Sequence, residues 1–259
     1  MDLRLSGKTA IVTGASRGIG LAITRALIDE GVRVVAAARE DTGELKELGA
    51  VPVIADLTSP DGPAAVAAAA AQAFGGALDI LVNNVGAVRP RPGGFATVTA
   101  ADWAATMAVN FLAAVHMTRL ALPLLTGQGG GSIITISSVN AALPDPLVID
   151  YSAAKAALTS FCKALSKEVG PHGVRVNTIS PGPVATDLWL GSGGVAETLA
   201  SVAGSTPGDV AAAAVADTPT RRFTEPGEVA DLVLFLASPR AGNITGADFA
   251  IDGGLNPTL

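Results

Sequence analysis

The sequence predicts an α/β protein built as one domain around an open, doubly wound parallel sheet with helices on both faces. Three observations favour this class. Short β-branched runs alternate with longer helical segments, the runs are apolar almost without interruption, and a glycine-rich turn follows the first run. Uninterrupted Val/Ile runs are typical of strands buried on both faces, as in parallel sheets covered by helices. The alternation alone would also suit a closed barrel.

About seven strands and the helices between them are expected in order. The strands are expected at residues 9–14, 32–38, 51–56, 78–84, 131–138, 174–180 and 246–252. Helices are expected from the glycine turn through Leu27 and at 44–48, 60–74, 101–125, 150–169 and 225–236, the last with Glu225 and Glu228 at its positive end. Residues 187–218 are rich in Gly, Ala and Ser and are expected to form a mobile substrate lid. No linker divides residues 1–259, so a single domain is expected.

The composition limits the class of partner. The 259 residues carry a net charge of −6, which does not suit a nucleic-acid-binding surface. The least charged stretch, residues 103–118, falls short of the ~20 apolar residues of a membrane span, and no apolar leader precedes Lys8. We therefore expect a cytoplasmic protein with neither a nucleic-acid nor a membrane partner.

Cysteine and histidine give no sign of a metal or redox centre. Cys162 is the single cysteine and is expected to be buried and inert on a helix. His116 and His172 have no partner at metal-ligand spacing, so both are expected to be structural and no metal is expected.

The glycine-rich turn decides between the two α/β architectures. The segment TGASRGIG places Gly14, Gly18 and Gly20 at the spacing G-x-x-x-G-x-G, rather than the G-x-G-x-x-G of the standard dinucleotide fingerprint. Glycines let a pyrophosphate approach the backbone, and the N–H groups at the start of the following helix attract the anion. A tight turn without a ligand would also explain the glycines. Their position after the first strand favours a Rossmann-like sheet over a barrel.

The residues after the second strand indicate which dinucleotide is bound. An acidic residue at this position would hold the 2′-hydroxyl of NAD. Here the strand ends in Arg39, with no carboxylate before Glu40, and Arg17 in the glycine turn can reach the same side. Two guanidinium groups suit a 2′-phosphate, so NADP(H) is expected. The alternative is that both arginines are simply solvated.

Together with later motifs, these residues resemble the short-chain dehydrogenase/reductase family over nearly the whole chain. The family's T-G-x-x-x-G-x-G matches Thr13 to Gly20, its Asp-aliphatic pair matches Asp56–Leu57, and its N-N-A-G matches Asn83 to Gly86. Its helix asparagine matches Asn110, its serine matches Ser138, and its Y-x-x-x-K matches Tyr151 with Lys155. Its P-G with a following threonine matches Pro181–Gly182 with Thr186. Val85 replaces the alanine of N-N-A-G, which adds bulk near the cofactor. The pattern is most similar to that of 3-oxoacyl-[acyl-carrier-protein] reductases.

The resemblance implies a strand order of 3-2-1-4-5-6-7 and a set of site residues. By this resemblance, the catalytic residues are Asn110, Ser138, Tyr151 and Lys155. Its cofactor contacts are Gly14, Ser16, Arg17, Gly18, Ile19, Gly20, Arg39, Asp56, Leu57, Asn83, Gly86, Tyr151, Lys155, Pro181, Gly182, Val184 and Thr186. The family is often tetrameric. The helix that begins at Tyr151 is apolar nearly all round, so a homotetramer or homodimer is expected.

Tyr151 is the only tyrosine, and Lys155 follows it at i+4 on the same helix face. A cation about 4 Å away would favour phenolate by about 4 kcal/mol, or about three pKa units before desolvation. We therefore expect the phenol to approach neutrality and to exchange the proton of a carbonyl reduction. Ser138, or its neighbour Ser137, could stabilise the substrate oxyanion. Asn110 either satisfies nearby backbone or, by resemblance, holds a water that relays protons through Lys155.

Residues 139–150 are expected to form one wall of the substrate site, and Leu143, Trp189 and Leu190 are apolar candidates for substrate contact or for plain packing. The predicted function is an NADP(H)-dependent oxidoreductase that acts on a carbonyl or secondary alcohol. The alternatives are an NAD-dependent sugar or steroid alcohol dehydrogenase and, of another class, a non-catalytic dinucleotide sensor. The intact set of Ser138, Tyr151 and Lys155 argues against the sensor.

Overall fold

A seven-stranded parallel sheet forms the centre of the molecule. The computed structural model describes residues 1–40 and 43–258. The strands are β1 (Thr9–Thr13), β2 (Arg33–Ala38), β3 (Val51–Ile54), β4 (Ile80–Asn83), β5 (Gly131–Ile136), β6 (Val174–Pro181) and β7 (Asp248–Ile251). They lie in the order β3-β2-β1-β4-β5-β6-β7. This confirms the predicted fold class and strand order.

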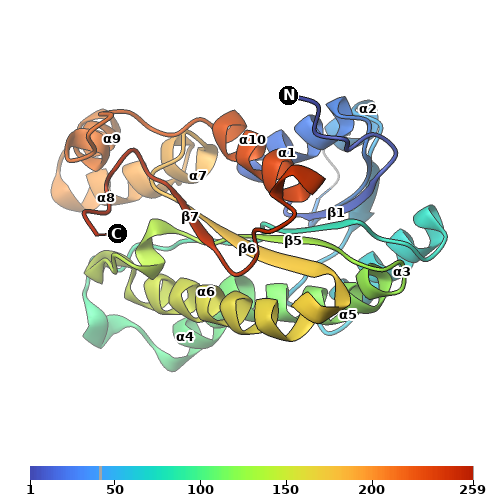
Figure 1. Cartoon of the computed structure of the whole chain (residues 1–259). Helices are drawn as coiled ribbons and strands as arrows, with labels where there is room; N and C mark the ends of the chain where they lie inside the picture. The colour runs from blue at the N-terminus through green and yellow to red at the C-terminus, as the bar shows by residue number, and fades with distance from the viewer. Residues whose placement is uncertain (41–42, 259) are drawn as a thin grey trace.

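Helices cover both faces of the sheet (Figure 1). They are α1 (Gly18–Asp29), α2 (Glu44–Glu47), α3 (Gly62–Phe74), α4 (Ala100–Met107), α5 (Ala113–Thr126), α6 (Ile149–Val169), α7 (Asp187–Leu190), α8 (Val195–Ala203), α9 (Pro207–Ala216) and α10 (Pro226–Ala237). Helices α1 and α10 pack on one face, and α3, α5 and α6 pack on the other. Glu225 and Glu228 form the expected acidic cap at the start of α10.

Each face of the sheet has its own apolar core. Strand β1 shows the division: Ala10 and Val12 join the core under α1 and α10, whereas Ile11 joins the core under α3, α5 and α6. Successive side chains of a strand point to opposite faces, so a strand buried on both sides must be apolar throughout. All five β1 residues are indeed buried.

The sheet reverses its winding between β1 and β4. Ile11 of β1 pairs with Val35 of β2 on one side and with Leu81 of β4 on the other. The crossovers from β1 to β2 and from β3 to β4 therefore leave in opposite directions. In such sheets a ligand crevice opens at the carboxyl ends of the strands beside this reversal.

The helix predicted at residues 101–125 is interrupted. Helices α4 and α5 are joined by a π-helical turn, Ala108–Leu112, with Asn110 buried in it. The combined stretch Ala100–Thr126 is long and apolar enough by length and composition to cross a membrane, but Met117, Ala121 and Leu125 of α5 belong to the sheet's core. The stretch is accounted for as one of the helices that cover the sheet. The uncommon π turn marks Asn110 as a position of interest.

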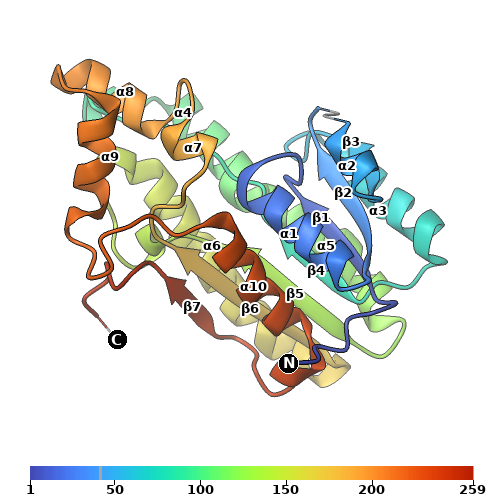
Figure 2. The same ribbon diagram turned by 90° about the horizontal axis from the view of Figure 1, so that it is seen from above.

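Residues 187–216 form three short helices, α7, α8 and α9, beyond the carboxyl ends of the strands (Figure 2). The sequence left their helices uncertain because Gly, Ala and Ser carry little periodicity. Trp189 of α7 packs edge-on against Phe223, with ring centroids 5.7 Å apart. No residue of α9 is buried among those described.

Candidate active site

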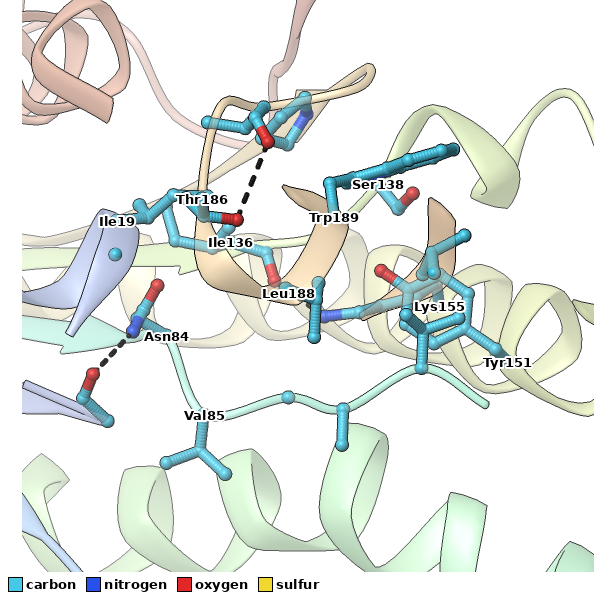
Figure 3. Close-up of a pocket in the computed structure, with 18 of the residues that line it drawn as sticks. Ile19, Asn84, Val85, Ile136, Ser138, Tyr151, Lys155, Thr186, Leu188 and Trp189 are labelled. Carbon is cyan, nitrogen blue, oxygen red and sulfur yellow. Dashed lines mark hydrogen bonds between the residues drawn. The ribbon is translucent and has the colours of Figure 1, made fainter. Parts of the chain in front are cut away.

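A cleft of about 1060 Å³ opens at the carboxyl ends of β1, β4, β5 and β6. The glycine turn before α1 lines one end of it, and the start of α6, the segment after β5 and helix α7 line the other. Figure 3 shows Ile19 and Asn84 toward one end, and Tyr151, Lys155 and Trp189 toward the other. The cleft therefore joins the predicted cofactor and catalytic residues in one space.

The glycine turn leaves its backbone open to an anion. Gly14 and Gly18 have φ values of +65° and +53°, where glycine is favoured. A Cβ at Gly20 would lie 2.1 Å from the carbonyl oxygen of Gly14. Arg17 is the N-cap of α1, and no side chain caps the helix. These open N–H groups and the tight turn fit the pyrophosphate of a dinucleotide. Ser16 and Ile19 also line the cleft.

The second asparagine of NNVG, rather than the first, lies in the cleft. The side chain of Asn83 points into the core and donates to Thr118 Oγ1 at 2.9 Å. Asn84 donates to the carbonyl oxygens of Thr13 and Gly14 at 3.0 and 3.1 Å and lines the cleft. Because side chains alternate along β4, the side chain of Asn83 faces away from the cleft, and the structure does not support the contact with the cofactor that was expected for it. Asn84 ties β4 to the glycine turn instead.

The end of the cleft lined by the glycine turn carries both positively and negatively charged side chains. Arg17 and Arg39 line it as predicted, together with Glu40 and Asp56. Hydrogen bonds from the backbone and hydroxyl of Thr58, and to a smaller extent the charge of Arg39, hold the pKa of Asp56 below its usual value. Leu57 is buried and also lines the cleft. The two guanidinium groups are exposed, so they can reach a phosphate there.

Pro181 ends β6, Gly182, Val184 and Thr186 follow it, and all four line the cleft as predicted. A Cβ on Gly182 would lie 2.9 Å from Cα of Asp252, so this position has no room for a side chain. A Cβ on Gly18 would lie 3.2 Å from Cγ2 of Thr186. The segment after β6 therefore closes over the glycine turn.

Ser138, Tyr151 and Lys155 meet on one wall of the cleft (Figure 3). Lys155 is buried and donates from Nζ to the carbonyl oxygen of Ile136 at 2.8 Å. Its Nζ lies 5.7 Å from the centroid of the Tyr151 ring. Burial lowers the pKa of Lys155 to about 8. The amine is therefore charged at neutral pH, though less firmly than an exposed lysine.

The pKa of Tyr151 departs from the expectation. Burial raises the pKa of the phenol above its ordinary value, and a hydrogen bond with Ser138 opposes this only in part. The prediction that Lys155 brings the pKa of the phenol toward neutrality is wrong for this chain, because burial of the phenol raises its pKa and Lys155 Nζ donates to the carbonyl oxygen of Ile136. A phenol with a raised pKa stays protonated at neutral pH and can act as a proton donor.

The two serines after β5 have different partners. Ser137 is buried, with its hydroxyl 2.8 Å from Thr159 Oγ1. Ser138 donates to Asn140 Oδ1 at 3.2 Å and bonds to Tyr151. Ser138 is thus the serine next to the phenol, as the family pattern implies.

Asn110 contacts backbone rather than the cleft. Its amide donates to the carbonyl oxygens of Ala87 and Thr106 at 2.8 and 3.1 Å, and Oδ1 accepts from Ala87 N–H at 3.0 Å. A Cβ on Gly86 would lie 3.1 Å from Asn110 Oδ1 and 3.4 Å from Lys155 Nζ. Two roles were expected for Asn110, hydrogen bonding to nearby backbone or holding a water, and these bonds correspond to the backbone role. They fix the loop after β4 beside Lys155.

A buried ion pair beside Tyr151 was missed by sequence reasoning. Arg91 Nη2 lies 2.5 Å from Oδ2 of Asp150, which is 1% exposed, and Nη1 lies 2.9 Å from Oδ1 of Asp102. Thr106 Oγ1 donates to Asp150 Oδ2 at 2.7 Å. Burial tends to raise the pKa of Asp150, but the bonds from Arg91 and Thr106 outweigh it and lower the pKa. A carboxylate directly before the candidate acid was the only available signal.

Two of the three apolar residues expected to contact the substrate line the cleft. Leu143 and Trp189 line the cleft, but Leu190 does not. Leu188 lines it instead. Leu190 is 51% exposed on α7, outside the lining of the cleft, so the structure does not support the substrate contact expected for it.

The remaining chemistry-bearing residues lie elsewhere. His116 and His172 are exposed. Over residues 1–40 and 43–258 no three His, Cys, Asp or Glu residues gather as a metal site would require. Cys162 is buried, and burial raises the pKa of its thiol to about 11.

Comparisons with known proteins agree with this geometry. A family model described as enoyl-(acyl carrier protein) reductase matches residues 14–256. The 3-oxoacyl-[acyl-carrier-protein] reductase of Vibrio cholerae is 33% identical over 98% of this chain and 99% of its own length. D-threitol dehydrogenase of Mycolicibacterium smegmatis is 35% identical over 98% and 94%. The solved L-sorbose reductase of Gluconobacter frateurii, complexed with NADPH and L-sorbose, superposes with a TM-score of 0.91 at 33% identity and covers both chains fully.

The chain therefore belongs to the short-chain dehydrogenase/reductase family. It is an oxidoreductase of the class that acts on CH–OH groups with NAD(P).

Proposed function

We propose that this enzyme is an NADP(H)-dependent reductase that converts a ketone to a secondary alcohol. The observation that carries the proposal is the placement of Ser138, Tyr151 and Lys155 on one wall of the cleft whose far end is the open glycine turn. When bound there, the nicotinamide supplies a hydride. Ser138 hydrogen-bonds the substrate oxygen, and the protonated phenol of Tyr151 donates the proton. The Lys155 ammonium stabilises the phenolate that results.

NADP(H) is proposed over NAD(H) because Arg17 and Arg39 both line the far end of the cleft. The L-sorbose reductase with the same fold was solved with NADPH. The test is to titrate both reduced cofactors by fluorescence with wild type, Arg17→Ala and Arg39→Ala. Each variant should lose roughly tenfold or more in NADPH affinity, as expected for a charged partner of a phosphate, and little in NADH affinity. Equal binding of both cofactors by wild type would contradict the assignment.

A 3-oxoacyl-like ketone is the leading substrate type, by similarity to the Vibrio cholerae reductase. The alternative, an NAD-dependent sugar alcohol dehydrogenase, is favoured by the D-threitol dehydrogenase relative. A screen of NADPH and NADH consumption with 3-oxoacyl esters, cyclic ketones and ketoses separates the two. If no carbonyl compound were reduced although the cofactor binds, the non-catalytic sensor would be favoured instead.

The assembly and the lid belong to the same proposal. Ala153, Ala156 and Ala164 lie exposed along α6, a surface that a second copy of the chain could cover in a homodimer or homotetramer. Light scattering at micromolar concentration tests this, and a monomer would contradict it. We propose that residues 1–259 act as one cytoplasmic domain, with residues 187–218 closing over the substrate.

A further inference from the structure

We propose that the substrate is an uncharged ketone with an apolar chain, and that the site disfavours carboxylates, phosphates and polyhydroxy compounds. This inference rests on the proposed reductase activity and narrows its substrate class. The two ends of the cleft differ in charge, and that difference is its starting point.

The cations of the cleft lie at its cofactor end and on the catalytic wall. Arg17, Arg39 and Lys155 all line that end or the catalytic wall. Beyond Ser138 and Tyr151, the charged side chains among the lining residues are two carboxylates, Asp145 and Asp187. No lysine, arginine or histidine lines this substrate end in the part of the chain that the structure describes. A substrate carboxylate or phosphate would have no partner there, and an unpaired charge in an apolar site is costly.

The walls of the substrate end are apolar. Its lining includes Val88, Leu143, Leu147, Leu188, Trp189 and Leu199, which come from four separate segments of the chain. Leu143, Leu147 and Leu188 are 36%, 40% and 43% exposed. Large apolar side chains that stay exposed around a cavity mark a surface that an apolar ligand covers.

Asn140 and Asp145, two of the polar side chains of this end, already have partners within the protein. Asn140 accepts from Ser138 Oγ at 3.2 Å and donates to the carbonyl oxygen of Leu143 at 3.3 Å. Asp145 Oδ1 accepts from the N–H of Leu147 at 2.8 Å. Few donors remain for the hydroxyl groups of a sugar, and buried hydroxyls without partners would weaken its binding.

The experiment compares substrates that share one reacting ketone. Initial rates with NADPH are measured for ethyl 3-oxohexanoate, 3-oxohexanoate and L-sorbose. The expected kcat/KM for the ester exceeds that for each of the other two by at least about 100-fold. Each CH2 added to the acyl chain of the ester should raise kcat/KM roughly three- to fourfold until the cleft is filled. Equal or better turnover of the carboxylate or the ketose would overturn the inference while leaving the reductase activity intact.

Binding measured without turnover keeps the two failures distinct. Calorimetric titration of the protein with ethyl 3-hydroxyhexanoate and with 3-hydroxyhexanoate, in the presence of NADPH so that no hydride can be transferred, should give at least tenfold tighter binding of the ester. If no ketone were reduced, the proposed reductase activity would be rejected. The ratio of the affinities for the ester and the carboxylate would still decide which class of ligand binds. Equal affinities would overturn the inference.

A matched pair of variants tests the location. Leu143→Arg places a cation in the substrate end, whereas Val51→Arg places one at a similarly exposed apolar residue, 44% exposed, at the start of β3 and outside the cleft. Leu143→Arg should raise kcat/KM for 3-oxohexanoate by about tenfold and lower it for the ester, as expected for one new charged partner. Val51→Arg should leave both values within about twofold of wild type. The same change in both variants, or no change in either, would contradict the assigned location.

Discussion

Two segments form the substrate end of the cleft, and they are stabilised by different kinds of contact. The segment from β5 to the start of α6 is held by buried polar contacts: Lys155 on Ile136, and Asp150 on Arg91 and Thr106. The segment containing α7, α8 and α9 borders the same space, yet residues 201–209 are all exposed. One segment is fixed by buried hydrogen bonds and an ion pair, whereas in the other the hydrogen bonds of Thr206 and Asp209 are exposed and the apolar contacts are few.

This difference in packing matches the different roles proposed for the two segments, proton transfer in the first and substrate contact in the second. Proton donation requires atoms held to a fraction of an ångström, so its residues lie on a rigid helix supported by packing and hydrogen bonds. Apolar substrate contact requires area rather than direction, so it can be made by lightly packed helices. Changes in the first segment should therefore affect turnover and global stability, and changes in the second should affect local stability and substrate choice.

The largest effect is expected at Tyr151. Tyr151→Phe removes the proton donor and should lower kcat by a factor of about 10² to 10⁴, while NADPH binds as before. Stopped-flow rates and a fluorescence titration measure the two. Retention of more than a few per cent of the activity would show that another group supplies the proton.

The second effect concerns the ion pair that holds the start of α6. Asp150→Asn leaves the charge of Arg91 less compensated and should cost about 3 kcal/mol in the free energy of unfolding. Because the folded pKa of Asp150 is lowered, its stabilisation is present above the unfolded value of about 3.9 and is lost as pH falls through the folded pKa. Urea unfolding between pH 3 and 7 measures the difference from wild type.

Asp209→Asn is the matched control for this ion pair. Asp209 also has a lowered pKa, from hydrogen bonds with Thr206, but it is exposed on α9. Its substitution should have the smaller effect on global unfolding. An equal or larger loss in Asp209→Asn would show that the two segments do not differ in this way.

The third effect is the pH dependence that Lys155 confers. Burial lowers its pKa from 10.5 to about 8, so the unfolded chain binds more protons between these pH values. The cost of burying the ammonium, about 3 kcal/mol, is full below pH 8 and is relieved as pH rises toward 10.5. The stability of wild type relative to Lys155→Met should therefore rise over that range in denaturant titrations. A constant difference would contradict the lowered pKa.

The smallest effect is expected in α9. Thr206 caps this helix by accepting from the N–H of Asp209 at 3.2 Å. Thr206→Ala should cost α9 about 1 kcal/mol and raise its amide hydrogen exchange roughly fivefold. Amides of β5 should exchange at the wild-type rate, and faster exchange there would show that the two segments unfold together.

Much of this protein could be predicted from its sequence. The Val/Ile runs and the glycine turn from Gly14 to Gly20 predicted the parallel sheet and the place of the cleft, because backbone requirements and burial on two faces are local properties of a sequence. The strand order came from the family resemblance. The family resemblance also indicated that Ser138, rather than Ser137, belongs beside Tyr151.

Only the tertiary structure decided how the side chains meet. It turned Asn83 into the core and Asn84 into the cleft, placed Leu188 rather than Leu190 in the lining of the cleft, and paired Arg91 with Asp150 across 59 residues of chain. It also reversed the expected pKa shift of Tyr151. Facing direction, long-range pairing and desolvation depend on what surrounds a residue in space, which spacing along the chain does not specify.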